Sequence, residues 1–160
     1  MKSWPQGILA WLERFAQAVR EEDFTTGRGL FLEETQSFGT RTAAAGNLQE
    51  LVDQQWRAVW PNTEGFTFAL AEATANFALS AGEDLCTVWV RWHSFTRVSA
   101  VSGNYPELRS LRCGRCTIVL VRAQEFQHLP EEAASWKAVH SHFSMEPQDR
   151  DWERQITVPQ

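Results

Sequence analysis

The chain has 160 residues, 43% of them hydrophobic, and a net charge of −5, which is typical of one globular domain. The acidic balance argues against a nucleic-acid partner, and no stretch reaches the roughly 18 apolar residues of a membrane span. The three cysteines are an odd number, which excludes a simple disulfide framework. Because Glu13 and Arg14 interrupt the first apolar stretch, no signal peptide is predicted and we expect a cytoplasmic protein.

Helical patterns come first along the chain. Residues 7–24 repeat apolar side chains at helical spacing, and residues 23–31 predict a short second helix that Gly27 and Gly29 end. Residues 47–61 predict a long helix that Asn47 caps and Pro61 ends. The inner stripe of this helix is expected to hold Leu48, Leu51, Val52, Gln55, Trp56, Val59 and Trp60.

Strand patterns follow the helices. Residues 31–38 predict a strand or short hairpin, and β-branched and aromatic residues predict strands within 65–80, 84–98, 115–123 and 136–144. Residues 99–112 and 124–135 are expected to be long connections. This order favours an α+β fold with helices on one face of an antiparallel sheet. Because both faces of the longer strands carry apolar residues, we expect a homodimer through the outer sheet face.

The closing strands carry a family resemblance. The strand with Arg115 and Thr117, followed by "WKAVHSHFS" at residues 136–144, resembles the ending of the SnoaL-like branch of the nuclear transport factor 2-like superfamily. The resemblance covers about residues 6–147 of a single domain at 1–160, with a polar tail at 148–160 and a longer last hairpin loop at 123–135. It implies a cone-shaped half-barrel, in which a strongly bent antiparallel sheet wraps around the N-terminal helices and leaves a pocket. Members of the superfamily include isomerases, dehydratases, cyclases, ligand binders and oligomerisation domains.

Arg91 and His93 are the candidate catalytic residues on the strand at 84–98. They alternate with Val88, Val90 and Trp92 and share a strand face with Trp89. Arg91 resembles the pocket arginine of the kinase-association domains of this superfamily, which implies a pocket cation suited to a carboxylate or carbonyl. The alternative for Arg91 is an internal salt bridge, for example to Glu33 or Glu72. The same Glu33 is a further candidate for moving a proton.

Other residues are expected to line the pocket. Trp56 and Trp60 lie one helical turn apart, so they should face the sheet together, although core packing alone would also explain them. On the last strand, the face opposite His140 and His142 is expected to point into the pocket. The predicted ligand-binding set is Trp56, Trp60, Trp89, Arg91, His93, Ile118, Val139, Ser141 and Phe143.

His140 and His142 also raise the question of a metal site. They lie two residues apart on one strand face, and Cys113 and Cys116 could supply two more zinc ligands from the preceding strand. Since the histidine pair belongs to the family ending, we favour a structural role and predict neither a metal nor a cofactor.

Three functions remain open from the sequence. The first is a homodimer that binds a small apolar ligand carrying a carboxylate or carbonyl group. The second is a cofactor-independent isomerase, dehydratase or cyclase, in which Arg91 would polarise an oxygen and His93 or Glu33 would move the proton. The third is an oligomerisation domain whose pocket is filled by its own aromatic side chains.

Overall fold

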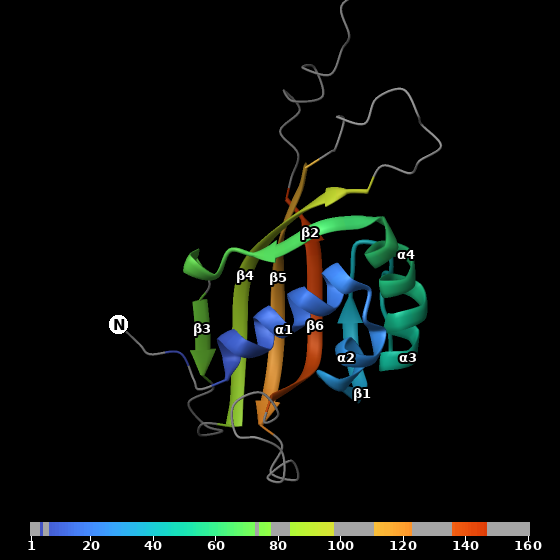
Figure 1. Ribbon diagram of the computed structural model, residues 1–160. Helices are drawn as coiled ribbons and strands as arrows, with labels where there is room; N and C mark the ends of the chain where they lie inside the picture. The colour runs from blue at the N-terminus through green and yellow to red at the C-terminus, as the bar shows by residue number, and fades with distance from the viewer. Residues whose placement is uncertain are drawn as a thin grey trace, which may run out of the picture.

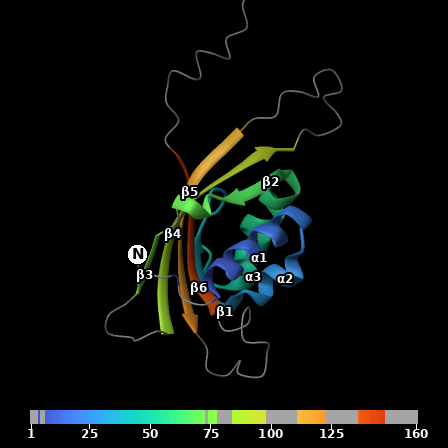
Figure 2. The ribbon, with the colours of Figure 1, turned by 60° about the vertical axis from the view of Figure 1, so that its left-hand side comes forward.

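The computed structural model describes residues 4, 7–72, 74–77, 84–97, 111–122 and 136–146. Most of the connection predicted at 99–112, the long loop at 123–135 and the tail from 147 lie outside these residues. The fold is the predicted α+β class, with helices packed on one face of a bent sheet (Figures 1 and 2). None of the described helices has the length and apolar character needed to cross a membrane.

Two helices begin the chain. Helix α1 (Ile8–Glu21) buries the apolar stripe expected from its spacing, from Ile8 to Val19, and crosses the concave side of the sheet (Figure 1). Helix α2 (Phe24–Gly29) is capped by Asp23, whose carboxylate accepts hydrogen bonds from the backbone N–H and the hydroxyl of Thr26. These hydrogen bonds lower the pKa of Asp23.

The predicted long helix runs from Leu48 through several segments. It comprises α3 (Leu48–Leu51), a π-helical segment (Val52–Trp56), α4 (Arg57–Val59) and a 3₁₀ turn (Trp60–Asn62). The side-chain oxygen of Asn47 accepts a hydrogen bond from the backbone N–H of Glu50 at 2.9 Å, so the predicted cap is present. The wider π-helical turn is a local departure of a kind often found at functional sites.

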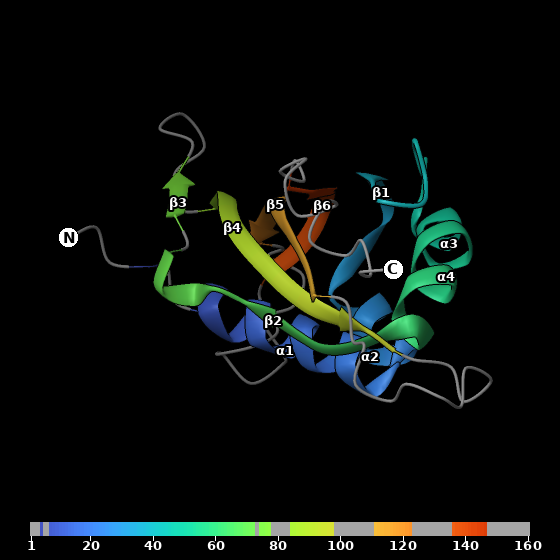
Figure 3. The ribbon, with the colours of Figure 1, turned by 90° about the horizontal axis from the view of Figure 1, so that it is seen from above.

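The sheet has six strands. Its order is β1 (Phe31–Phe38), β6 (Trp136–Met145), β5 (Leu111–Arg122), β4 (Leu85–Thr96) and β2 (Thr63–Phe68), and β3 (Thr74–Phe77) also pairs with β4. The predicted strand region at 65–80 is therefore two strands, and residues 111–112 belong to β5 rather than to a connection. All pairings are antiparallel except β1 with β6, which is parallel. Strands β4 and β5 curve strongly around the helices (Figure 3).

The concave face of β4 carries Val88, Val90 and Trp92, all buried, whereas Trp89, Arg91 and His93 are exposed on the outer face. The prediction that the last three point into the pocket is therefore wrong. The physical reason is that the sheet turns the uncharged side of this strand toward the helices and leaves the arginine and histidine in solvent.

Strand β6 contains an irregularity that the sequence analysis did not foresee. The register with β5 shifts between the pairs Val119↔His140 and Leu120↔Ala138, which makes Val139 an extra residue. Ala138 and Ser141 are consequently both buried, although strict alternation would place them on opposite faces. The bulge therefore lets the start of β6 fill the core while its second half faces the pocket.

Candidate functional site

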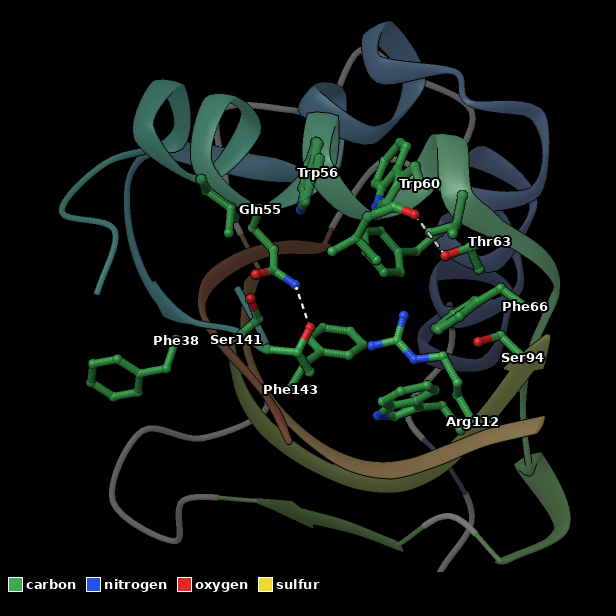
Figure 4. Close-up of a pocket in the computed structure, with 16 residues that line it drawn as sticks. Phe38, Gln55, Trp56, Trp60, Thr63, Phe66, Ser94, Arg112, Ser141 and Phe143 are labelled. Atoms are coloured by element: carbon green, nitrogen blue, oxygen red, sulfur yellow. Dashed lines mark hydrogen bonds between the residues drawn. The ribbon is translucent and has the colours of Figure 1, made fainter. Parts of the chain in front are cut away.

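A pocket lies between the long helix and the concave face of the sheet (Figure 4). The space between its side chains measures about 560 Å³ when the part that opens to solvent is counted. Side chains from α1, the long helix, five strands and the loop after β1 contribute to it. The lining residues are Phe15, Val19, Phe38, Thr40, Leu51, Gln55, Trp56, Val59, Trp60, Thr63, Phe66, Trp92, Ser94, Arg112, Ser141 and Phe143.

Stacked tryptophans form the helix side of the pocket. The rings of Trp56 and Trp60 lie 4.5 Å apart at an interplanar angle of 18°, and Phe24 stacks on Trp60 at 5.1 Å. Helix α2 can approach this pair because Gly27 has no side chain: a Cβ there would lie only 2.6 Å from the Trp60 ring. The tryptophans are thus held as a rigid wall.

Trp92 and Phe143 form the sheet side. Their rings lie 6.4 Å apart, and Phe66 packs against both. The indole of Trp92 lies over its cross-strand partner Gly114 and donates a hydrogen bond to the Arg115 carbonyl at 3.3 Å. The two aromatic walls leave a space suited to a planar apolar group.

Arg112 places a positive charge in this aromatic pocket. It is half-buried on the concave face of β5, directly across from Ser94 on β4, and its guanidinium reaches toward Phe143 (Figure 4). Its hydrogen-bond partner is the Met145 sulfur at 3.8 Å, and no described carboxylate lies within salt-bridge distance. An unpaired guanidinium beside aromatic rings is costly to desolvate, and an anionic ligand would offset that cost.

Gln55 and Thr40 form a neutral polar group at another side of the pocket. The Gln55 carbonyl oxygen accepts a hydrogen bond from the Arg41 backbone N–H at 2.7 Å, and its amide nitrogen donates to the Thr40 hydroxyl at 3.0 Å. Nearby on β6, the hydroxyls of Ser141 and Ser37 lie 2.9 Å apart. The first two contacts join the long helix to the loop after β1, and the third joins β1 to β6.

The predicted site residues divide into two groups. Trp56, Trp60, Ser141 and Phe143 line the pocket, whereas Ile118 is fully buried in the core and Val139 occupies the bulge.

The candidate catalytic residues lie elsewhere. The guanidinium of Arg91 contacts Glu146 on the outer face at 2.7 Å, so neither Glu33 nor a pocket ligand is the partner shown. Glu33 has an exposed side chain 3.8 Å from Arg28. Trp89 and His93 are exposed on the same outer face as Arg91.

The four residues considered for zinc are not brought together. Cys116 is buried on the concave side, whereas His142 is exposed on the other face of the sheet. His140 Nδ1 lies 2.8 Å from the Gln36 carbonyl oxygen. Among the described residues, no group of three or more histidine, cysteine or acidic side chains could hold a metal ion.

Arg112 is the charged lining residue that the sequence analysis did not predict, and the polar lining residues Thr40 and Ser94 were not predicted either. A signal was present, because counting back in steps of two from the buried Ile118 through Cys116 and Gly114 reaches Arg112 on the same strand face. Residue 112 had instead been predicted to end the connection at 99–112. The pocket cation expected at Arg91 is therefore supplied by the neighbouring strand.

Comparisons with known proteins agree with this architecture. The family model described as SnoaL-like domain matches residues 8–147. Comparison with curated proteins gives no match.

Solved structures share the fold at low sequence identity. A nuclear transport factor 2-like superfamily protein from Salmonella enterica superposes with a TM-score of 0.65 at 17% identity, covering 88% of this chain and 89% of that one. A putative calcium/calmodulin-dependent protein kinase II association domain from Xanthomonas campestris gives 0.66 at 9% identity, covering 89% and 87%. A ketosteroid isomerase-like protein from Erwinia carotovora gives 0.64 at 12% identity, covering 89% and 95%.

Proposed function

The chain belongs to the SnoaL-like domain family, and from this premise we propose that it binds a small planar carboxylate in the pocket between the long helix and the sheet. The observation that carries the proposal is the guanidinium of Arg112, which lies among aromatic side chains without a described carboxylate partner. One guanidinium can hold one carboxylate through two parallel hydrogen bonds. The surrounding rings of Trp60, Trp92 and Phe143 match a flat apolar body.

The lining supports binding rather than proton transfer. Arg112 is the only ionisable side chain among the 16 lining residues, and a guanidinium stays protonated in proteins. The catalytic alternative relied on His93 or Glu33, and both side chains lie outside this set. A general base must reach the proton that it removes, so the described pocket favours a binding protein over an isomerase or dehydratase.

Substitution of Arg112 tests the proposal directly. Binding of benzoate, cinnamate and 2-naphthoate is measured by isothermal titration calorimetry and by quenching of tryptophan fluorescence, with 2-naphthamide as the neutral analogue. We expect Arg112→Met to weaken carboxylate binding by about 10-fold to 100-fold, the range for hydrogen bonds to a charged group. Arg115→Met is the matched control, because Arg115 is exposed on the opposite face of the same strand.

Two results would overturn this function. The first is the absence of binding for all three acids to the wild-type protein. The second is equal affinity of wild-type protein and Arg112→Met for the acids. Tighter binding of 2-naphthamide than of 2-naphthoate to the wild-type protein would likewise contradict a carboxylate site.

We also propose that two copies associate through the outer sheet face. The helices cover only the concave side (Figure 2), and Trp89 on the outer face is 48% exposed. A second copy would cover this indole, as apolar interface anchors require. Multi-angle light scattering of Trp89→Glu should show a monomer, whereas a monomeric wild-type protein would disprove the dimer. The cytoplasmic location stays a prediction.

A further inference from the structure

The polar lining of the pocket is divided between two sides. Arg112 and Ser94 lie on one side, at the ends of β5 and β4, and Gln55 and Ser141 lie on the other (Figure 4). The ring of Phe143 lies between these two sides in Figure 4 and forms part of the aromatic wall that connects them. A ligand whose carboxylate meets Arg112 therefore extends along aromatic walls toward a second polar group.

The orientation of the Gln55 amide follows from its partners. The Arg41 backbone N–H can only donate, so the atom that it meets at 2.7 Å is the Gln55 carbonyl oxygen. The amide nitrogen consequently faces the Thr40 hydroxyl at 3.0 Å. Gln55 is only 8% exposed, and a Cβ on Gly39 would lie 2.5 Å from its side chain. This packing holds the amide in one position.

Donor hydrogens remain at this side of the pocket. The amide nitrogen of Gln55 carries two hydrogens and uses one for Thr40, and the Thr40 hydroxyl accepts that bond while keeping its own hydrogen. Neither remaining hydrogen has an acceptor among the described residues.

The serine pair adds one more donor. Ser37 Oγ accepts a hydrogen bond from the Ser141 backbone N–H at 3.2 Å, and the two hydroxyls share a single contact of 2.9 Å. One hydroxyl hydrogen of the pair therefore remains, and it faces the pocket when Ser37 donates to Ser141, because only Ser141 of the two lines the pocket. Because Gln55, Thr40 and Ser141 all line the pocket, a ligand that carries an acceptor atom can take up a donor hydrogen that the protein leaves unused.

We propose that the ligand is a planar carboxylate that also carries a hydrogen-bond acceptor, such as a ketone oxygen, at the end remote from its carboxylate. The inference rests on the proposed function, because Arg112 sets the orientation of the ligand. The acceptor meets the Gln55 amide and the Thr40 hydroxyl, while the aromatic walls enclose the ring. The site thus selects keto-aryl acids over purely hydrocarbon acids of the same shape.

Two nearly isosteric acids test this selection. Acetylbenzoate and isopropylbenzoate differ in a carbonyl oxygen against a methyl group, and the meta and para isomers of each place that group at two distances from the carboxylate. For at least one isomer, we expect acetylbenzoate to bind the wild-type protein at least about fivefold more tightly, the effect of one satisfied donor. Hydrophobic burial alone would reverse this order, because isopropylbenzoate is the more apolar compound.

Thr40 offers a conservative pair of variants. Thr40→Val keeps the shape and removes the hydroxyl, so the preference for acetylbenzoate should fall by at least half, whereas Thr40→Ser should keep it. Circular dichroism checks that each variant is folded. Equal binding of the two acids by the wild-type protein, or an unchanged preference in folded Thr40→Val, would overturn the inference.

The two proposals can fail separately. If both acids bind and Arg112→Met weakens both, but the wild-type protein does not distinguish them, the carboxylate site stands and the acceptor site does not. If Arg112→Met binds acetylbenzoate as tightly as the wild-type protein, the proposed function itself fails.

Discussion

Ser94 on β4 and Arg112 on β5 are paired on adjacent strands, and both side chains line the pocket. Side chains paired in this way have Cβ atoms about 4.5–5.5 Å apart. Within the described residues, Ser94 has no hydrogen-bond partner for its hydroxyl. The pair therefore forms the polar end of an otherwise aromatic space.

This relationship predicts the effect of Ser94→Asp. The new carboxylate would pair with the Arg112 guanidinium from within the protein, so it should weaken binding of 2-naphthoate by at least about tenfold. Ser94→Asn is the matched control, because an asparagine side chain has nearly the same shape as aspartate and carries no charge. Calorimetric affinities of the two variants provide the check. Equal affinities would show that Arg112 does not hold the carboxylate.

Arg91 provides a second prediction, of no effect on binding. Arg91 is exposed on the outer sheet face, where it pairs with Glu146. Arg91→Met should leave the affinity for 2-naphthoate within about twofold and reduce stability by no more than the ~1 kcal/mol typical of an exposed ion pair. Titration calorimetry and urea unfolding measure the two quantities. A tenfold loss of affinity would contradict the position of Arg91 on the outer face of β4 and would indicate that it contacts the ligand.

Adding a single methyl group at Gly114 is expected to reduce both stability and ligand binding. A Cβ at this position would overlap the Ser144 carbonyl and the ring of Trp92. Gly114→Ala should therefore lower the free energy of unfolding by about 1–3 kcal/mol through overpacking, and it should weaken binding of 2-naphthoate by displacing a pocket wall.

Gly29→Ala is the control for Gly114→Ala. No atom lies within 4 Å of a Cβ there, so its free energy of unfolding should be unchanged or higher, by up to about 1 kcal/mol. Urea unfolding compares the two variants. Equal stabilities would contradict the close approach of Trp92 to β5.

The buried thiol of Cys86 predicts a dependence of stability on alkaline pH. Burial raises its pKa from 9.0 to about 11, because a thiolate is disfavoured in an apolar environment. Between these pH values the unfolded chain releases a proton that the folded chain retains, so the free energy of unfolding should fall as the pH rises from about 9 to about 11. Below pH 8 this thiol should contribute no pH dependence.

Comparison with Cys86→Ala isolates this contribution from other groups that titrate at high pH. Urea unfolding at pH 7.5, 9, 10 and 11 should give a shallower fall for the variant than for the wild-type protein. Burial also raises the pKa of Cys116, so a second thiol should leave some dependence in the variant. Identical slopes for the two proteins would contradict the assignment.

Local patterns in the sequence determined most of the architecture. The apolar stripes of the first and third helical regions, the Asn47 cap and the strand at 84–98 predicted their elements correctly, because each depends on a spacing or a hydrogen bond within a few residues. The closing strands pointed to the family, which the match over residues 8–147 shows. Trp56 and Trp60 were placed toward the pocket for the same local reason: they lie one helical turn apart.

Only the tertiary structure decided which face of each strand meets the pocket. Alternation along β4 separated Trp92 from Arg91 but did not say which side the helices would cover. On β6 the bulge at Val139 changed the alternation itself, and it depends on the register with β5. Arg112 is the arginine in the pocket for a similar reason. Its position is set by pairing with Ser94 on another strand. Such pairings depend on packing between strands, which no local spacing in the sequence specifies.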